Sequence, residues 1–321
     1  MKAIVYEKYG SADVLRYTDA DKPSVGDDEV LVRVSAASIN HGDLFAMRGS
    51  PRLGRLAFGI GRPRQNVLGR AVAGTVDAAG RDVTRFKVGD EVFGEVNQRG
   101  FAEYVAAKQT LLAAKPAEVT FEQAATLPVA AETALRALRL GAVAPGGKVL
   151  VNGASGGVGT FAVQLAKKLG AQVTGVCSTR NVDLVRSIGA DHVIDYTRED
   201  VTRGKVLFDA VIDLVGNHRL SAFRRVLTPK GVYVSSSGSG GPVLGPIPRL
   251  VAATLVSPFV SQRLRGLFAT HDVEDLAHLA ALVVAGRITP VIERTYPLCE
   301  TPDAIRSLEA EHARGKIVLT V

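Results

Sequence analysis

The segment from Val149 to Gly159 constrains the fold of this chain more than any other. It reads Val-Leu-Val-Asn-Gly-Ala-Ser-Gly-Gly-Val-Gly, so an apolar strand runs into a turn of small residues and then into a predicted helix, 157–169. Small residues permit the tight turn, let backbone amides approach a pyrophosphate, and let the helix pack closely on the strand. The amino end of the helix then faces the negative charge. The segment predicts a dinucleotide site; the alternative is a tight turn in an α/β domain that binds no such ligand.

The candidate cofactor contacts in this turn are consecutive residues. Ala154, Gly156 and Gly159 have the spacing of the dinucleotide fingerprint, with alanine in the first place. The full set that we expect to contact the cofactor here is Ala154, Ser155, Gly156, Gly157, Val158 and Gly159.

The 321 residues are enough for two domains, and two patterns divide the chain at Pro116. Before it, short strands separated by turn residues predict a partly open barrel, with strands at 3–6, 30–34, 72–76, 91–93 and 101–105. After it, strands and helices alternate, which is typical of βαβ units and a parallel sheet. The expected helices are 122–140, 157–169, 181–188 and 272–285, and the expected strands are 149–152, 172–176, 192–194, 209–214 and 231–235. The tail from Thr289 adds a strand, a helix and a last strand, 316–321.

Composition excludes several classes of protein. With 46% hydrophobic and 22% charged residues, the chain can bury a large core, which excludes disorder. Cys177 and Cys299 are the only cysteines, too few for a four-thiolate zinc knot or a disulfide framework. The first seven residues carry charge, and no apolar run reaches the roughly 18 residues that span a bilayer. We expect a cytoplasmic protein without a signal peptide.

The positive charge is concentrated in two stretches. The formal net charge is +7, yet Leu44 to Val76 holds six arginines and no acid, and Leu214 to His271 holds seven bases and no acid. These stretches carry +13 and the remainder therefore −6. This focus suggests an anionic partner, such as a phosphorylated cofactor or an acidic membrane surface, against the alternative of two solvated loops. No readable motif favours nucleic acid.

The residues after the second strand of the parallel sheet favour NADPH over NADH. An NAD site usually ends this strand in Asp or Glu, which binds the ribose hydroxyls. Here Ser178, Thr179 and Arg180 follow Cys177, and no acid appears before Asp183. Two hydroxyls and a guanidinium can bind a 2′-phosphate. Tyr196, after the third strand, is expected beside the same phosphate.

Motifs along almost the whole chain resemble those of the medium-chain dehydrogenase/reductase superfamily, and within it the zinc-free quinone oxidoreductase-like branch. They are Ala36-Ala37-Ser38-Ile39-Asn40-His41-Gly42-Asp43, Val67-Leu68-Gly69, Val88 to Gly94, Gly100 to Val105, Ala124 to Pro128, Gly153 to Gly159, and Gly315 to Leu319. The resemblance implies a GroES-like β-rich catalytic domain over 1–121, completed by 287–321, a Rossmann domain over 122–286, and a homodimer.

The same resemblance argues against zinc. Zinc alcohol dehydrogenases of the superfamily place a cysteine where this chain has Asn40 and His-Glu where it has Arg70-Ala71. Their third ligand, a cysteine, would fall near Pro128–Val129, where this chain has none. Neither asparagine nor alanine can supply a thiolate or imidazole, and His41 alone is not a metal site. We therefore expect neither catalytic nor structural zinc.

Without a metal Lewis acid, hydride transfer to an electron-poor acceptor is easier than alcohol oxidation. The resembling family reduces quinones and α,β-unsaturated carbonyls, where the protein mainly positions and polarises. Asn40 is the candidate that hydrogen-bonds a carbonyl or the cofactor ribose; the alternative is a backbone-capping asparagine. Thr133 best matches a family threonine that contacts the nicotinamide end. No general acid stands out, so we expect the final proton to come from water.

The remaining expectations concern further cofactor contacts, the aromatic lining of a substrate pocket, and two long stretches. We expect Val215, Ser235 and Phe268 to contact the cofactor, and Phe45, Phe58 and Phe93 to wall a pocket for a flat substrate. Asp43 is expected to pair with Arg48. The stretches 50–66 and 240–268 are read as a lid or core first, a dimer contact second and a weak peripheral membrane contact third. Two other functions stay open: a reductase of ordinary carbonyls, and an NADPH-binding sensor or adaptor without turnover.

Overall fold

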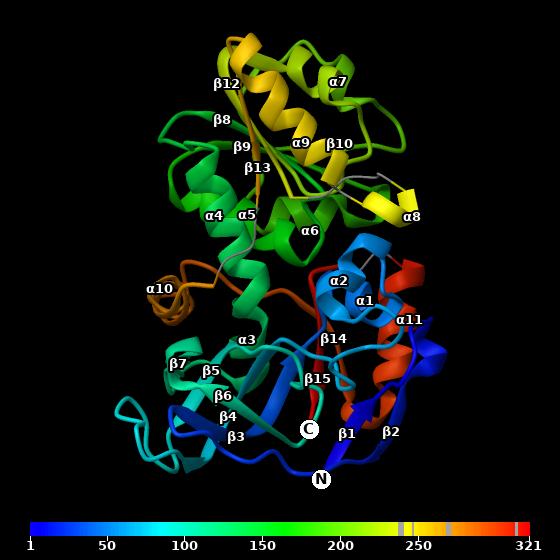
Figure 1. The fold of residues 1–321 in the computed structure, drawn as a ribbon. Helices are drawn as coiled ribbons and strands as arrows, with labels where there is room; N and C mark the ends of the chain where they lie inside the picture. Colours follow the sequence, from blue (N-terminus) through cyan, green and yellow to red (C-terminus); the bar gives the residue numbers. More distant parts are fainter. Residues whose placement is uncertain (237–240, 246, 268–270, 312–313) are drawn as a thin grey trace. The chain divides into compact units, whose positions relative to one another are not determined.

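The computed structural model describes residues 1–236, 241–245, 247–267, 271–311 and 314–321. Unit 1 comprises Met1–Glu132 and Thr270–Val321, and unit 2 comprises Thr133–Ala269 (Figure 1). In the described part of the chain, no helix has both the length and the apolar character needed to cross a membrane.

Unit 1 is built on a seven-stranded sheet in the order β14-β15-β3-β4-β5-β7, in which β6 also pairs with β3. Its strands are β3 (Glu29–Ser38), β4 (Ala71–Ala79), β5 (Glu91–Glu95), β6 (Tyr104–Lys108), β7 (Leu112–Ala114), β14 (Ile292–Pro297) and β15 (Lys316–Thr320), beside a separate pair, β1 (Lys2–Val5) and β2 (Arg16–Asp19). Its helices are α1 (His41–Arg48), α2 (Arg55–Phe58), α3 (Phe121–Thr126), α10 (Val273–Val284) and α11 (Thr301–Glu311). Because β15 pairs antiparallel with β3, the C-terminal strands complete the N-terminal sheet, as the GroES-like fold requires.

Unit 2 is a six-stranded parallel sheet in the order β10-β9-β8-β11-β12-β13. Its strands are β8 (Lys148–Asn152), β9 (Gln172–Cys177), β10 (His192–Asp195), β11 (Phe208–Asp213), β12 (Leu227–Ser235) and β13 (Arg263–Gly266). Its helices are α4 (Glu132–Leu140), α5 (Gly157–Lys168), α6 (Val182–Ser187), α7 (Leu220–Arg225), α8 (Gly241–Leu244) and α9 (Ile247–Val256). Counted along the unit, the order is 3-2-1-4-5-6, the Rossmann arrangement, and the order reverses between β8 and β11. Ligands of such sheets bind beyond the carboxyl ends of the strands at this point.

The boundaries between the units fall elsewhere than the sequence predicted, 121/122 and 286/287. Helix α3 packs on β3, β4 and β15, and α10 packs on β7, so both belong with unit 1. Amphipathic helices flanking a βαβ region look alike whichever sheet they cover, which explains the difference.

Two predicted elements are wrong in detail. The helix expected over 122–140 is broken, because Pro128 is extended (φ −58, ψ 146) and Val129 has φ 66. Pro128 has no N–H to donate to a helix. The strand expected over 101–105 begins at Tyr104, since Ala102 instead forms an isolated bridge with Ala3 of β1.

Candidate active site

The turn between β8 and α5 has the geometry of a pyrophosphate cradle. Gly156 caps α5 with extended backbone (φ −79, ψ 175), so the N–H groups of Gly157, Val158 and Gly159 have no helical carbonyl to bond. A Cβ on Gly159 would lie 2.0 Å from the carbonyl oxygen of Gly153, so glycine is required there. The turn therefore presents amides that have no partner among the described residues at a positive helix end, which fits a dinucleotide phosphate.

Alanine replaces the first fingerprint glycine because it faces the neighbouring strand. Ala154 is fully buried, and a Cβ on Gly175 of β9 would lie 3.0 Å from its own Cβ. Its N–H donates to the carbonyl of Val176 at 3.0 Å. The Ala154 methyl group therefore packs against β9 and not on the side of the turn where a phosphate would bind.

The predicted 2′-phosphate residues lie at the end of β9, but a carboxylate lies beside them. Ser178 is half-buried, and Thr179 and Arg180 are exposed. The Thr179 hydroxyl donates to Oδ2 of Asp195 at 2.6 Å, and this bond helps to lower the pKa of that carboxyl. Tyr196, next to Asp195 on β10, is 50% exposed. Although no acid closely follows Cys177 in the sequence, the Asp195 carboxylate lies beside these residues in the structure.

Asn181 joins the two halves of this subsite, and the sequence analysis missed it. Its Nδ2 donates to Oγ of Ser155 at 3.0 Å and to Oγ of Ser178 at 3.3 Å. Its Oδ1 is buried and has no partner among the described residues. An unpaired buried acceptor at this edge suits a ribose or adenine donor. The sequence feature that could have identified Asn181 is its position directly after Ser178, Thr179 and Arg180.

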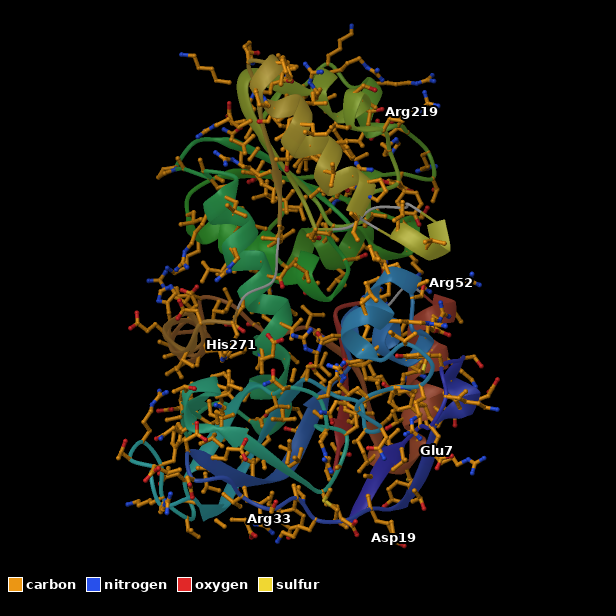
Figure 2. The ribbon with its side chains drawn as sticks, in the orientation of Figure 1. Glu7, Asp19, Arg33, Arg52, Arg219 and His271 are labelled. Atoms are coloured by element: carbon orange, nitrogen blue, oxygen red, sulfur yellow. The ribbon has the colours of Figure 1, made fainter. Side chains whose placement is uncertain are left out.

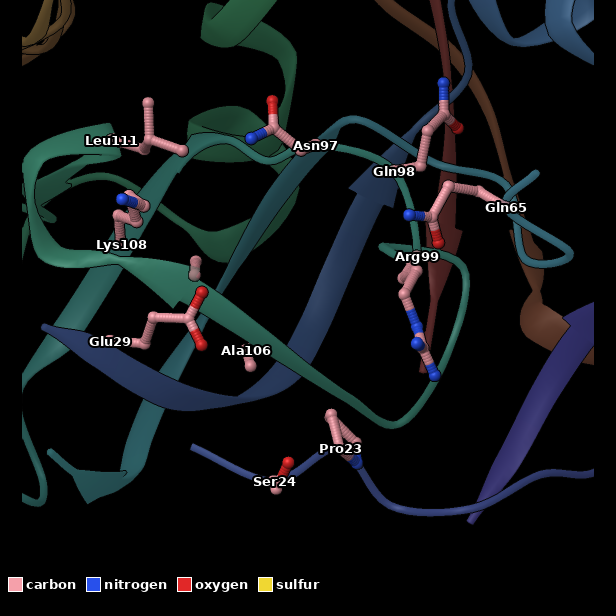
Figure 3. Close-up of a pocket in the computed structure, with 11 residues that line it drawn as sticks. Pro23, Ser24, Glu29, Gln65, Asn97, Gln98, Arg99, Ala106, Lys108 and Leu111 are labelled. Atoms are coloured by element: carbon pink, nitrogen blue, oxygen red, sulfur yellow. The ribbon is translucent and has the colours of Figure 1, made fainter. Parts of the chain in front are cut away.

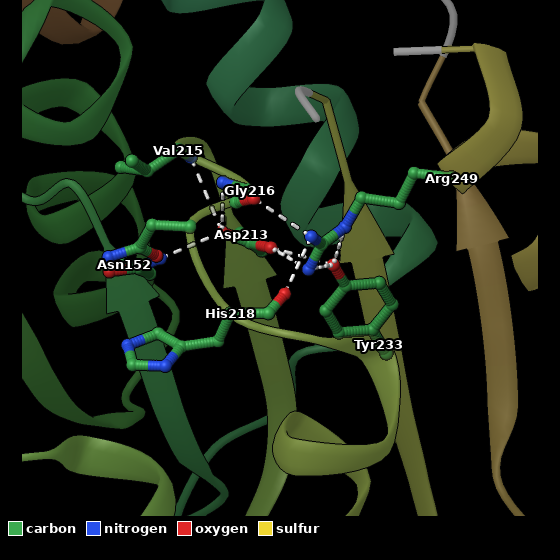
Figure 4. A network of polar contacts seen from close by, with 8 residues as sticks. Asn152, Asp213, Val215, Gly216, His218, Tyr233 and Arg249 are labelled. Carbon is green, nitrogen blue, oxygen red and sulfur yellow. Dashed lines mark hydrogen bonds and ion pairs between the residues drawn. The ribbon is translucent and has the colours of Figure 1, made fainter. Parts of the chain in front are cut away.

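Asp213 organises the point where the strand order reverses (Figure 4). It ends β11 beside Asn152 of β8, and its side chain is fully buried. Oδ1 accepts from Asn152 Nδ2 at 2.8 Å and from the N–H of Gly216 at 2.9 Å. Oδ2 accepts from Nη2 of Arg249, on α9, at 2.7 Å. This network fixes the loop that follows β11.

The residues expected at the nicotinamide end differ in exposure and lie on different elements. Val215 is 46% exposed and lies over the turn, since its Cγ2 is 2.8 Å from a Cβ built on Gly153. Ser235, at the end of β12, is fully buried, and Thr133 is half-buried in the first turn of α4. Phe268 lies outside the described residues.

Asn40 lies in unit 1 between β3 and α1 and is 6% exposed. Its Nδ2 donates to the carbonyl of Ser38 at 3.0 Å, and its Oδ1 accepts from Nζ of Lys316 at 2.6 Å. Its N–H donates to Oδ2 of Asp43 at 2.8 Å, and burial raises the pKa of Asp43 to about 6. The amide carbonyl is thus committed within the protein.

The predicted pairing of Asp43 with Arg48 is wrong. Arg48 lies at the last turn of α1 and pairs with Glu309 of α11 at 2.6 Å. Asp43, one helix turn earlier, points inward as a cap and is fully buried.

Arg70, one of the two residues that the resemblance sets against zinc ligands, pairs with Glu95. Glu95, Glu132 and His271 bring ligand-type atoms within 4.8 Å of one another. Nδ1 of His271 lies 3.1 Å from Oε2 of Glu132, and its Nε2 lies 2.9 Å from the carbonyl oxygen of Leu111. Burial opposes the charge of His271, but its hydrogen bond to Glu132 and the attraction of Glu132 and Glu95 raise its pKa.

The three phenylalanines predicted to wall a pocket differ in exposure. Phe45 on α1 is 44% exposed, Phe58 packs partly buried on the unit 1 core, and Phe93 in β5 is fully buried. Phe93 therefore cannot wall an open pocket. A pocket of about 320 Å³ in unit 1 is lined by polar groups such as Glu29, Lys108 and the side chains of residues 97–99, and by none of the predicted site residues (Figure 3).

Three arginines of the two basic stretches pair with acids outside them: Arg48 with Glu309, Arg70 with Glu95 and Arg249 with Asp213. These pairs reduce the charge available to an anionic partner. Arg55 keeps its charge, and it stacks over the Tyr9 ring at 4.5 Å and donates to the carbonyl of Gly49. Labelled arginines of both stretches, Arg52 and Arg219, reach the surface (Figure 2).

Helix α9, within the predicted lid stretch, belongs in part to the core. Ala253 is fully buried in the apolar cluster of unit 2, and Arg249 reaches Asp213. Val251 and Leu255 are 48% and 65% exposed on the other side. The dimer and membrane interpretations of this stretch stay predictions.

Comparison with known proteins identifies the family. Residues 26–117 match the alcohol dehydrogenase GroES-like domain, and residues 188–319 match the family described as zinc-binding dehydrogenase. NAD(P)H oxidoreductase RTN4IP1, mitochondrial, of Mus musculus is 35% identical, over 100% of this chain and 89% of the relative. The chain belongs to the medium-chain dehydrogenase/reductase superfamily.

Within that superfamily, the relatives point to the quinone oxidoreductase-like branch. The NADPH-dependent alkenal/one oxidoreductase, chloroplastic, of Arabidopsis thaliana is 33% identical, over 99% of this chain and 79% of the relative. The quinone oxidoreductase from Coxiella burnetii has a TM-score of 0.89 at 32% identity, covering 100% of this chain and 99% of that one. The Escherichia coli quinone oxidoreductase complexed with NADPH has a TM-score of 0.86 at 26% identity, covering 100% of both chains. This superfamily member is an NAD(P)H-type oxidoreductase.

Proposed function

We propose that this enzyme transfers hydride from NADPH to a quinone or an α,β-unsaturated carbonyl without zinc. The observation that supports the proposal is the state of the residues that the resemblance sets against zinc ligands. Asn40 is bonded to Lys316, Arg70 is paired with Glu95, and the side chain of Ala71 has no ligand atom. An acceptor that is already electron-poor needs orientation and a hydrogen bond to its oxygen, not a Lewis acid.

NADPH supplies the hydride when bound. The amides of Gly157, Val158 and Gly159 would bind its pyrophosphate, and Ser155, Ser178 and Asn181 would bind the adenosine ribose. Arg180 would pair with the 2′-phosphate, while Asp195 keeps Thr179 in place. Val215 would lie against the cofactor beside the glycine turn.

The test is NADPH and NADH consumption with a quinone, an enone and a saturated aldehyde. The proposal expects turnover with NADPH and the first two acceptors. Preferred turnover of the aldehyde would favour the ordinary carbonyl reductase instead. Tight NADPH binding with oxidation no faster than in buffer would favour the sensor or adaptor.

A further inference from the structure

The polar cavity of unit 1 has no role in the proposed function. Its volume is about 320 Å³, and it is lined by part of β6, the loop between β5 and β6, and the segment before β3 (Figure 3). Every lining residue belongs to unit 1, and none is among the residues predicted to bind cofactor or substrate. The volume is at the small end of the range for ligand pockets, so it suits a small molecule.

Two consecutive residues of this lining have a backbone conformation that side chains disfavour. Gln98 has φ 72 and Arg99 has φ 75, both in the left-handed region. Of the other non-glycine residues that the structure describes, only Val129 and Ala142 have a positive φ. Such strain persists where the surrounding structure enforces it, and it is common at ligand-binding sites. The N–H of Arg99 donates to the carbonyl of Val67 at 3.2 Å, which helps to hold the strained loop in place.

The strained residues also place polar groups in the protein without giving them partners. Oε1 of Gln98 and Nε of Arg99 are buried and form no hydrogen bond with any described residue. Within the same described ranges, the guanidinium of Arg99 has no carboxylate at ion-pair distance. Arg99 is half-buried and lines the cavity. A guanidinium in this setting suits a ligand carboxylate, because its planar fork of N–H groups matches the two oxygens.

The other end of the cavity is acidic. Glu29 of β3 lies opposite Lys108 of β6 in the strand pairing, and Figure 3 shows both on the side away from Arg99. The ammonium of Lys108 pairs with Asp28 at 3.2 Å, and Oε2 of Glu29 accepts from the N–H of Gly26 at 3.1 Å. Two carboxylates and one ammonium therefore leave this end with a negative charge. A cationic group is attracted there and an anionic group is repelled.

We propose that this cavity is a binding site for a small zwitterion, a molecule that carries a carboxylate and an ammonium group as an amino acid does. The carboxylate pairs with Arg99 and the ammonium pairs with Glu29, at opposite ends of the lining. Opposite charges at the two ends select for a ligand with both groups and orient it in the cavity. The site lies within unit 1 and involves no hydride transfer, so it does not depend on the proposed function.

Isothermal titration calorimetry with the standard amino acids tests the proposal, and acetate and ethylamine are the controls that carry one charge each. We expect at least one amino acid to bind with a Kd roughly tenfold or more below that of either control, because only the zwitterion uses both ends. No detectable binding of any amino acid at millimolar concentration would overturn the proposal. Acetate binding as tight as that of every amino acid would also overturn it, because the cavity would then be a simple anion site.

Glycine variants separate loss of the ligand from loss of the fold. Arg99→Gly removes the guanidinium and also relieves the positive φ, so the melting temperature should not fall. Amino acid binding should nevertheless weaken by roughly tenfold or more. Gln98→Gly relieves the same kind of strain and keeps both charged ends, so its Kd should stay within roughly threefold of wild type. Undiminished amino acid binding in Arg99→Gly would overturn the proposal.

Two further variants test the acidic end and the specificity of the effect. Glu29→Gln keeps an oxygen that can accept from Gly26 but removes the charge, so it should weaken amino acid binding and not acetate binding. Arg33→Gln is the matched control for Arg99, because Arg33 is an exposed arginine on β3 outside the lining. A loss of binding in Arg33→Gln equal to that in Arg99→Gly would contradict the assignment, because the effect would then come from the overall charge of the protein.

Discussion

Nη2 of Arg249, on α9, lies 2.7 Å from Oδ2 of Asp213, at the carboxyl end of β11. The same guanidinium donates from Nη1 to the carbonyls of Gly216 and His218 at 2.9 Å and 2.7 Å. One side chain thus ties α9 to the strand end and to the loop that follows it. The loop includes Val215, which lies against the glycine turn. The position of Val215 beside the predicted cofactor site therefore depends on an ion pair between residues that are far apart in the sequence.

Arg249→Met should strongly destabilise unit 2. Asp213 is fully buried, and removing its partner leaves an uncompensated charge, which costs about 3–5 kcal/mol. The free energy of unfolding in urea measures the loss. Arg263→Gln, an exposed arginine on β13, is the control and should change it by less than about 0.5 kcal/mol. Similar losses of unfolding free energy in the two variants would show that the Arg249–Asp213 pair does not stabilise unit 2 more than a surface arginine does.

Gly159 and Gly156 should respond differently to alanine. A Cβ at Gly159 would meet the carbonyl oxygen of Gly153 at 2.0 Å, so Gly159→Ala should distort the turn and lower both the melting temperature and NADPH affinity. A Cβ at Gly156 would have its nearest neighbour at 3.6 Å and an ordinary φ of −79, so Gly156→Ala should fold normally. It should still weaken NADPH binding by roughly tenfold, because the methyl group would face the pyrophosphate. NADPH titration by fluorescence, with thermal melts, checks both; wild-type affinity in Gly159→Ala would contradict the cradle.

Arg180 should determine the preference for NADPH. Arg180→Gln should raise KM for NADPH by roughly tenfold and leave KM for NADH unchanged, since only NADPH has the 2′-phosphate. Arg186→Gln, on α6, is the control, because its side chain is 64% exposed and pairs with Asp183. Asp195→Asn should favour NADPH further, because it removes the carboxylate beside Thr179. Equal changes with both cofactors would place Arg180 outside the phosphate subsite.

His271 should make the stability of the protein depend on pH. Burial opposes its charge, but the hydrogen bond to Glu132 and the attraction of Glu132 and Glu95 leave its pKa raised. The contribution is fully present below the unfolded pKa of about 6.5 and is lost as pH rises through the raised folded value. The difference in free energy of unfolding between wild type and His271→Gln should therefore shrink as pH rises. A pH-independent difference for His271→Gln would contradict the raised pKa of the imidazole.

Local patterns predicted much of this fold, and contacts between distant segments account for what was missed. The turn from Gly153 to Gly159 is a continuous stretch, and its small residues predict a dinucleotide site. The alternation of strands and helices around it predicts the parallel sheet. Asp195 escaped notice because it lies on β10, and its proximity to Thr179 comes from strand pairing, not from sequence distance. Lys316 and Asn40 are 276 positions apart and meet only because β15 pairs with β3.

The prediction for Phe93 was wrong for a related reason. An isolated phenylalanine has no pattern that distinguishes a pocket wall from core, and Phe93 lies in a strand whose side chain is fully buried. The break at Pro128 and Val129 was visible as a proline, yet the apolar spacing on both sides suggested one continuous helix.

The most direct test of the account follows the hydride itself. The protein is dialysed against a strong chelator and given NADPH carrying deuterium at the transferred 4-position, together with an enone, and the product is examined by mass spectrometry. The account predicts deuterium on the β-carbon of a saturated ketone, formed at the same rate before and after chelation. Deuterium on a carbinol carbon, or turnover that chelation abolishes and Zn²⁺ restores, would contradict it.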